Sequence, residues 1–136
     1  KKKLKFPKII HPSVIIADNV KMGKGIIIQA GSIIPPDSKI GNFVLINLKS
    51  HIGHDCKIED FVSIMTNVDV NGQTIIKKGA YIASGVVIRN LLTIGKWSVI
   101  GLGSVVGSEI EDYSLYLGNP ARQIKKIKSE SSRPSL

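Results

Sequence analysis

Cysteine, aromatic residues and long apolar segments are all scarce in this sequence of 136 residues. The single cysteine, Cys56, cannot form an internal disulfide, so burial of side chains must stabilise the fold. Aromatic residues make up 5% of the chain against 43% hydrophobic residues, so the core must be largely aliphatic. No apolar run approaches the roughly 18 residues of a membrane-spanning helix, and no signal peptide follows the lysine-rich start. We therefore expect one globular domain, a cytoplasmic location and no membrane partner.

The net charge of +9 is concentrated at the two ends of the chain. Residues 1–8 carry five lysines, residues 122–133 carry an excess of four positive charges, and residues 9–121 are neutral overall. A nucleic-acid groove needs basic residues on the folded body, interleaved with aromatic residues or placed on a recognition helix. The pattern predicts no nucleic-acid partner and favours solvated terminal charges, with ends that help to hold an anionic ligand as the alternative.

An aliphatic residue or methionine occupies every sixth position from Ile10 to Val106, seventeen times without an insertion. Four residues after each lies a second column of mostly small or β-branched residues, from Val14 to Ile110. The second column and the next aliphatic residue are two positions apart, so they share one face of a short strand and both point inward. Small or turn-tolerant residues such as Gly53 follow the aliphatic residue, where we expect the chain to bend.

This six-residue period predicts an all-β solenoid rather than a helix. Six is not a multiple of 3.6, and β-branched residues are abundant. Each hexad gives one short strand and one corner, three sides close a triangular coil, and coils stack as parallel strands about 4.8 Å apart. Residues 10–111 would form between five and six coils of a handedness that the period does not determine. Asn119 and Pro120 start either a short helix to Lys128 or one more strand.

Three motifs accompany the repeat: His11-Pro12-Ser13, His54-Asp55-Cys56 and Gly118-Asn119-Pro120-Ala121-Arg122. Together they resemble bacterial hexapeptide-repeat acyltransferases, above all the sialic acid O-acetyltransferase and amino-sugar N-acetyltransferase (NeuD/PglD-like) family. The resemblance covers residues 6–124. It implies a left-handed parallel β-helix, a homotrimer with active sites between subunits, acetyl-CoA as co-substrate and a place in bacterial surface-glycan synthesis.

The resemblance also suggests a division of the chain. Residues 1–9 form a basic lead-in, residues 10–118 a left-handed β-helix acyltransferase domain, and residues 119–136 a C-terminal extension that ends in a disordered tail. Family members usually carry, before the His-Pro-Ser motif, a Rossmann-like domain that binds the nucleotide-sugar acceptor. We expect this chain to be either a catalytic-domain fragment or a shorter relative. Its acceptor is an amine or a hydroxyl of a sugar or a nucleotide-linked amino sugar, with N- and O-acetylation both open.

His54 and Asp55 are the candidate catalytic residues. Acyl transfer needs a base at the attacking amine or hydroxyl, and histidine suits this task at neutral pH. His54 lies at an outward position of its hexad. Asp55 matches the acidic residue that, in the family, orients the histidine and raises its basicity. Adjacent residues on a straight strand point in opposite directions, so this role requires a corner.

The candidate coenzyme-binding residues follow from the family. Gly72 lies 18 residues after His54 and matches the position whose amide meets the acetyl carbonyl, although a turn glycine fits nearly as well. Ser84 and Leu102 match coenzyme contacts that are mostly main-chain atoms. Ser63 stands where the family often has a second histidine, so its role toward coenzyme or acceptor is open.

Two other classes of function remain open. A lyase like the γ-class carbonic anhydrases would need convergent histidines, and His51, His54 and Cys56 are the nearest candidates. Cys56 belongs to the inward column whereas His54 points outward, so we expect no metal. A non-catalytic structural solenoid would favour stacked threonines on a flat outer face. This chain has three threonines, Thr66, Thr74 and Thr93, and no two of them are 18 residues, or one coil, apart. The structural solenoid is therefore not favoured.

Overall fold

The computed structural model describes residues 3–128, and these residues form strands but no helix. No segment of this part of the chain is therefore a helix long and apolar enough to cross a membrane. Two-residue strands recur every six residues until β17, and two longer strands follow. The strands are β1 (Ile9–Ile10), β2 (Ile15–Ile16), β3 (Lys21–Met22), β4 (Ile27–Ile28), β5 (Ile33–Ile34), β6 (Lys39–Ile40), β7 (Leu45–Ile46), β8 (His51–Ile52), β9 (Lys57–Ile58), β10 (Ser63–Ile64), β11 (Asp69–Val70), β12 (Ile75–Ile76), β13 (Tyr81–Ile82), β14 (Val87–Ile88), β15 (Thr93–Ile94), β16 (Val99–Ile100), β17 (Val105–Val106), β18 (Ser114–Gly118) and β19 (Ala121–Lys126).

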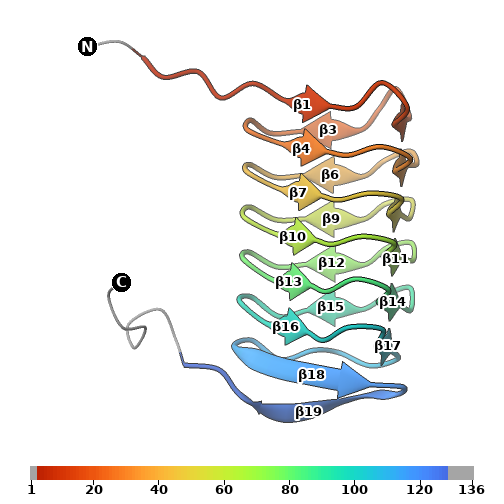
Figure 1. Cartoon of the computed structure of the whole chain (residues 1–136), viewed down its shortest axis with the longest axis vertical. Coiled ribbons are helices and arrows are strands. Elements are labelled where there is room, and N and C mark those ends of the chain that lie inside the picture. The colour runs from red at the N-terminus through yellow and green to blue at the C-terminus, as the bar shows by residue number, and fades with distance from the viewer. Residues whose placement is uncertain (1–2, 129–136) are drawn as a thin grey trace.

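The strands form the three sides of a prism, as expected. Sheet A contains β1, β4, β7, β10, β13, β16, β18 and β19; sheet B runs from β2 to β17; sheet C runs from β3 to β15. Within each sheet, strands three apart in sequence pair in parallel, as β8 pairs with β11. In Figure 1 the chain runs to the right along the front, returns to the left along the back and descends with each turn, which is the left-handed sense. The fold is a left-handed parallel β-helix of about six turns.

Both inward columns are buried and form one continuous core. Isoleucines such as Ile52 and Ile64 are completely inaccessible to solvent. The hydroxyls of serines in the second column form hydrogen bonds with nearby backbone carbonyls. For example, Ser38 Oγ donates to the Gly53 carbonyl at 2.9 Å. No buried side-chain polar atom in residues 3–128 lacks a hydrogen-bond partner. The regular stack of branched aliphatic side chains thus needs no cross-links.

The bends lie two residues later than we expected from the sequence. In most turns the residue three positions after the inward aliphatic residue adopts a left-handed conformation, as do Asp55 (φ 56°) and Phe61 (φ 60°). The position directly after the aliphatic residue needs a small side chain for another reason. A Cβ at Gly53 would lie 2.7 Å from the carbonyl carbon of Asn71 in the next coil. Small residues there permit the close stacking of coils and do not make the turn.

The C-terminal end closes the prism with a hairpin. β18 pairs in parallel with β16, and β19 pairs antiparallel with β18. The segment after Asn119 and Pro120 is therefore a strand, which decides between the two alternatives that the sequence left open. Tyr116 and Ala121 join the buried core from these strands. The predicted disordered tail, residues 129–136, lies outside the described residues.

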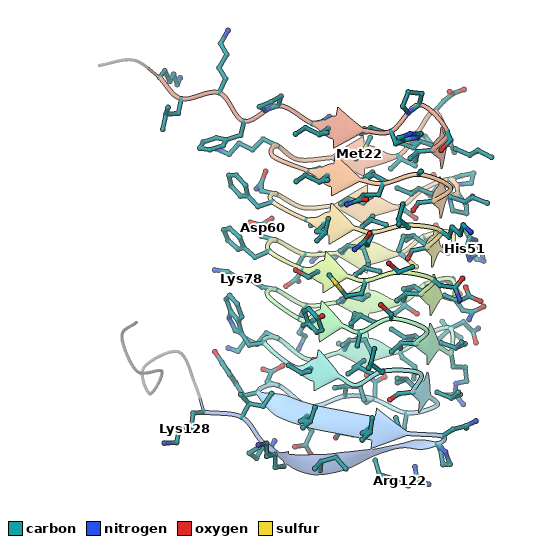
Figure 2. The ribbon with its side chains drawn as sticks, viewed as in Figure 1. Met22, His51, Asp60, Lys78, Arg122 and Lys128 are labelled. Atoms are coloured by element: carbon teal, nitrogen blue, oxygen red, sulfur yellow. The ribbon has the colours of Figure 1, made fainter. Side chains whose placement is uncertain are left out.

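The three edges of the prism are named after the sheets that they join. Residues 53–56 belong to the BC corner, residues 83–86 to the AB corner and residues 59–62 to the CA corner. In Figure 2, Asp60 and Lys78 mark the CA corner at the left, and His51 lies on sheet B at the right. Each corner repeats once per coil, so residues that are 18 positions apart lie in one column along the prism.

Candidate active site

His54 and Asp55 share one turn of the BC corner, between β8 and β9. The left-handed conformation of Asp55 turns its carboxylate back toward its neighbour, and His54 Nδ1 lies 2.7 Å from Asp55 Oδ2. A straight strand would hold these two side chains apart. Their side chains are 63% and 51% exposed, so the pair is accessible to a substrate. The corner that the Asp55 role requires is therefore present.

The turns of adjacent coils hold this pair in place. The Asp55 amide donates to the Pro36 carbonyl at 3.1 Å, and the Gln73 amide donates to the His54 carbonyl at 2.8 Å. The turn is thus fixed from both sides along the prism. A general base benefits from such a rigid support because its position relative to the reacting atom decides its efficiency.

Gly72 lies beside the His54 ring in the next coil. A Cβ at Gly72 would lie 2.6 Å from His54 Nε2 and 2.9 Å from Cε1, so the ring occupies space that any other residue would fill. The Gly72 amide makes no hydrogen bond within residues 3–128, and its carbonyl accepts from the Leu91 amide at 3.1 Å. The structure thus brings together three of the six residues singled out in the sequence.

The other three lie elsewhere on the prism. Ser84 and Leu102 share one column of the AB corner, where the Gly103 amide donates to the Ser84 carbonyl at 3.0 Å. Ser63 begins β10 on the outer face of sheet A. His54 is at the BC corner, so one copy of the chain does not place these residues around its base.

A second histidine–carboxylate pair lies close by on sheet B. His51 Nδ1 is 2.9 Å from Asp69 Oδ1, and in-register pairing of β8 with β11 places the two residues side by side. The sequence analysis did not identify this pair. Their separation of 18 residues, which is one coil, was the signal that could have revealed it.

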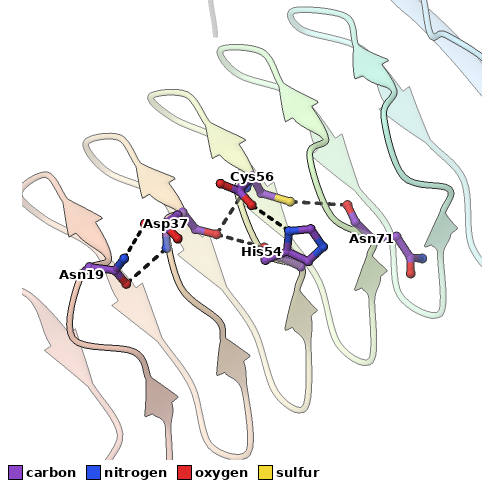
Figure 3. Close-up of polar contacts among 8 residues, drawn as sticks. Asn19, Asp37, His54, Cys56 and Asn71 are labelled. Carbon is purple, nitrogen blue, oxygen red and sulfur yellow. Dashed lines mark hydrogen bonds and ion pairs between the residues drawn. The ribbon is translucent and has the colours of Figure 1, made fainter.

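Cys56 points into the core and is 1% exposed. Its Sγ contacts the Asn71 carbonyl at 3.4 Å, as Figure 3 shows beside the outward His54. Burial raises the pKa of the Cys56 thiol, because a thiolate would lose its hydration there. A protonated, inaccessible thiol is a poor nucleophile. Across residues 3–128, no three histidine, cysteine or acidic side chains converge as a metal site would require.

Comparisons with known proteins identify similar sequences and structures. Residues 55–90 match the family described as "Bacterial transferase hexapeptide (six repeats)". The dTDP-3-amino-3,6-dideoxy-α-D-galactopyranose 3-N-acetyltransferase of Aneurinibacillus thermoaerophilus is 51% identical over 51 residues, which are 38% of this chain and 27% of that protein.

Solved structures extend the likeness over most of the chain. A variant of perosamine N-acetyltransferase from Caulobacter crescentus, in complex with CoA and GDP-perosamine, has a TM-score of 0.88 at 27% identity over 90% of this chain. The acetyltransferase domain of PglB from Neisseria gonorrhoeae has a TM-score of 0.87 at 28% identity over 88% of this chain. The chain spans 58% of the length of each of these structures. The related proteins are thus sugar acetyltransferases of the NeuD/PglD-like type.

Proposed function

We propose that this hexapeptide-repeat β-helix, whose relatives are sugar acetyltransferases, transfers an acetyl group from acetyl-CoA to an amine or hydroxyl of a sugar or nucleotide-linked amino sugar. The reaction belongs to bacterial surface-glycan synthesis. The observation that carries the proposal is the exposed His54–Asp55 pair beside Gly72, on a fold shared with the perosamine enzyme. A metal-dependent lyase and a structural solenoid are not favoured, because the related proteins are acetyltransferases.

In the proposed reaction His54 is the general base. An Nδ1–H donated to Asp55 leaves the lone pair on Nε2, which accepts the proton of the acceptor as its nitrogen or oxygen attacks the thioester carbonyl. Asp55 stabilises the imidazolium that forms. The unpaired Gly72 amide is placed to donate to the oxyanion of the tetrahedral intermediate. Collapse of the intermediate breaks the carbon–sulfur bond, and the leaving thiolate takes the proton from His54.

We further propose that the enzyme is a homotrimer. Ser84, Leu102 and Ser63 lie on the AB corner and on sheet A, so they reach the His54 of a second copy rather than their own. The outer faces of sheets A and B carry exposed aliphatic residues, including Ile27 and Ile33, which suit a subunit interface. The proposed location is the cytoplasm, because acetyl-CoA is a cytoplasmic metabolite.

The test is acetyl transfer by His54→Ala. With a panel of nucleotide-linked amino sugars and sialic acid, we expect CoA release to fall by about 10²- to 10⁴-fold, because the base acts in the transition state. Binding of acetyl-CoA should be nearly unchanged. Lys24→Ala is the control, since Lys24 is exposed at the CA corner, where its Nζ lies over the Phe6 ring. Activity retained by His54→Ala would overturn the assignment, and a 14.7 kDa monomer in sedimentation would overturn the trimer.

A further inference from the structure

A column of three lysines runs along the outer face of sheet C in the N-terminal half of the prism. Parallel pairing in register places Lys21 beside Lys39 and Lys39 beside Lys57. The three side chains are exposed on the outer face of the sheet. They come from neighbouring strands, which lie roughly 4.8 Å apart. Like charges placed directly opposite destabilise a sheet. The column therefore does not stabilise the fold. It ends at Lys57, because the next residues at this position toward the C-terminus are Ile75 and Thr93.

Two of these lysines have no counter-charge. Lys57 Nζ lies 3.3 Å from Glu59 Oε1, whereas Lys21 and Lys39 make no ion pair with any residue from 3 to 128. The chain between its basic ends is neutral overall, so this is a local excess of positive charge. An anion bound at the column would relieve the repulsion between the ammonium groups.

The column borders a hollow of about 440 Å³ on the side of the CA corner. Gly23 and Gly41 contribute to this hollow, whose lining contains four lysines and two carboxylates. Both carboxylates are already engaged by the backbone. Asp60 Oδ1 accepts from the Asn42 amide at 2.7 Å, and Glu59 Oε2 accepts from the Lys78 amide at 3.0 Å. Four lysines against two carboxylates leave the lining of this hollow with a net positive charge.

On its other side the column reaches the candidate active site. A second hollow, of about 290 Å³, is lined by Lys21 and Lys39 and by two acidic residues, Asp37 and Asp55, among others. Lys57 follows His54 by three residues, and Lys39 and Lys21 lie one and two coils nearer the N-terminal end. A ligand on the column therefore lies against the His54–Asp55 pair on its N-terminal side.

We propose that the Lys21–Lys39–Lys57 column is a diphosphate-binding site, and that the diphosphate is that of a nucleotide-linked acceptor sugar; this assignment of the ligand rests on the proposed function. Lysine ammonium groups are point charges that suit phosphate oxygens. Coenzyme A also contains a diphosphate. The residues assigned to the coenzyme, Gly72, Ser84 and Leu102, all lie in later coils, so the coenzyme approaches His54 from the C-terminal side and the acceptor from the side of the lysines.

The test compares two variants of equal net charge. Lys21→Gln/Lys39→Gln removes two charges from the column, and Lys125→Gln/Lys128→Gln removes two from β19 and the segment that follows it. Calorimetry with inorganic pyrophosphate should give a Kd at least about tenfold higher for the column variant and nearly unchanged for the control, because charge-assisted contacts are lost only in the former. The column variant should fold at least as stably as the wild type. Equal affinities in the two variants, or no binding by the wild type at millimolar pyrophosphate, would overturn the site.

Two further measurements identify the source of the diphosphate. The Kd of CoA should be the same in both variants, and weaker binding of CoA by the column variant would assign the lysines to the coenzyme and overturn the proposal. In steady-state kinetics the column variant should raise the acceptor KM about tenfold at nearly constant kcat. An unchanged acceptor KM with normal turnover would reject the acceptor site and leave the proposed function intact. Lysine-dependent pyrophosphate binding without any acetyl transfer would reject the proposed function and leave the diphosphate site intact.

Discussion

The BC and CA corners use the same backbone turn for different purposes. Asp55 at the BC corner and Phe61 at the CA corner both adopt left-handed conformations, with φ values of 56° and 60°. At the CA corner the ring of Phe61 stacks on that of Phe43, with centroids 5.5 Å apart and planes 5° from parallel. At the BC corner the carboxylate of Asp55 instead meets the imidazole of His54. One turn thus supports aromatic packing in one column and holds the candidate catalytic pair in the other.

The difference shows what the repeat determines and what it leaves free. The inward columns must be aliphatic or small, whichever corner they adjoin, because they fill the core. The turn residue in the left-handed position lies outside the core and contacts its column neighbours or, as Asp55 does, the residue before it, so its identity can vary without loss of the core. At the CA corner those neighbours are rings with lysines over them, as Lys78 Nζ lies 5.5 Å from the Phe61 centroid. At the BC corner the left-handed column continues with Gln73, and Gly72, directly before it, makes room for the His54 ring.

The strongest test of this contrast is Gly72→Ala. The new Cβ would lie 2.6 Å from His54 Nε2, so the ring must move away from its position. We expect turnover to fall by about 10- to 100-fold, since a base displaced by roughly 1 Å loses much of its effect. Gly107→Ala, also between sheets B and C, is the control because a Cβ there meets nothing within 4 Å. Similar turnover in both variants would show that the contact between Gly72 and His54 is unimportant.

Asp55→Asn should have the next largest effect on activity. The amide keeps the shape of the side chain and an oxygen that can accept from Nδ1, but it loses the negative charge that stabilises the imidazolium. We expect kcat to fall about tenfold with little change in the KM of acetyl-CoA. A kcat of Asp55→Asn equal to that of the wild type would exclude a contribution of Asp55 to the action of His54.

The inner columns could be predicted from the sequence, and the outer surface only in part. The uninterrupted series from Ile10 to Val106 is sufficient to predict the stack of parallel coils, because its period determines which side chains are buried. The bend was misplaced, since glycines such as Gly53 suggest turns but in fact allow close stacking. His51 and Asp69 were not paired because their contact crosses coils. Handedness needed the resemblance or the structure, as the period is the same for either hand.

The lysine column on sheet C was also hidden in the sequence. Residues 9–121 are neutral overall, because the charges of Lys21 and Lys39 are balanced by acidic residues elsewhere in this segment. Only the coil length brings the two lysines side by side. The motif residues His54 and Asp55 were easier to find because they are adjacent in the chain and their contact needs only the turn. Contacts within one turn are therefore predictable from local sequence, while contacts between coils require the register.

At the CA corner a substitution should change stability and not activity. Phe61→Ala removes the stacking on Phe43 and the contact with Lys78, and we expect a loss of about 1 to 2 kcal/mol in the free energy of unfolding. Leu91→Ala is the matched control at the BC corner, since Leu91 is also exposed and left-handed but stacks on no ring. Denaturant titration and turnover should be measured on both variants. A large loss of turnover in folded Phe61→Ala would contradict the division between the corners.

The smallest effect on activity is expected for Cys56→Ala, although Cys56 directly follows the candidate catalytic pair. The thiol is buried and contacts the Asn71 carbonyl inside the prism, so acetyl transfer should be direct and need no acetylated enzyme. Turnover should stay within about twofold of the wild type, with stability lowered by about 1 kcal/mol through lost packing. Iodoacetamide should not modify the folded protein at pH 8.

The pH dependence of stability gives the same residue a second test. Burial raises the pKa of the Cys56 thiol, so the folded chain holds this proton more tightly than the unfolded chain. The resulting stabilisation is complete below the ordinary thiol pKa and declines as the pH rises through the raised value. Cys56→Ala should therefore lose less stability than the wild type between neutral and alkaline pH. An acetyl group found on the wild type after mixing with acetyl-CoA alone, and absent from Cys56→Ala, would instead establish a covalent route through this thiol and place it in the chemistry of the BC corner.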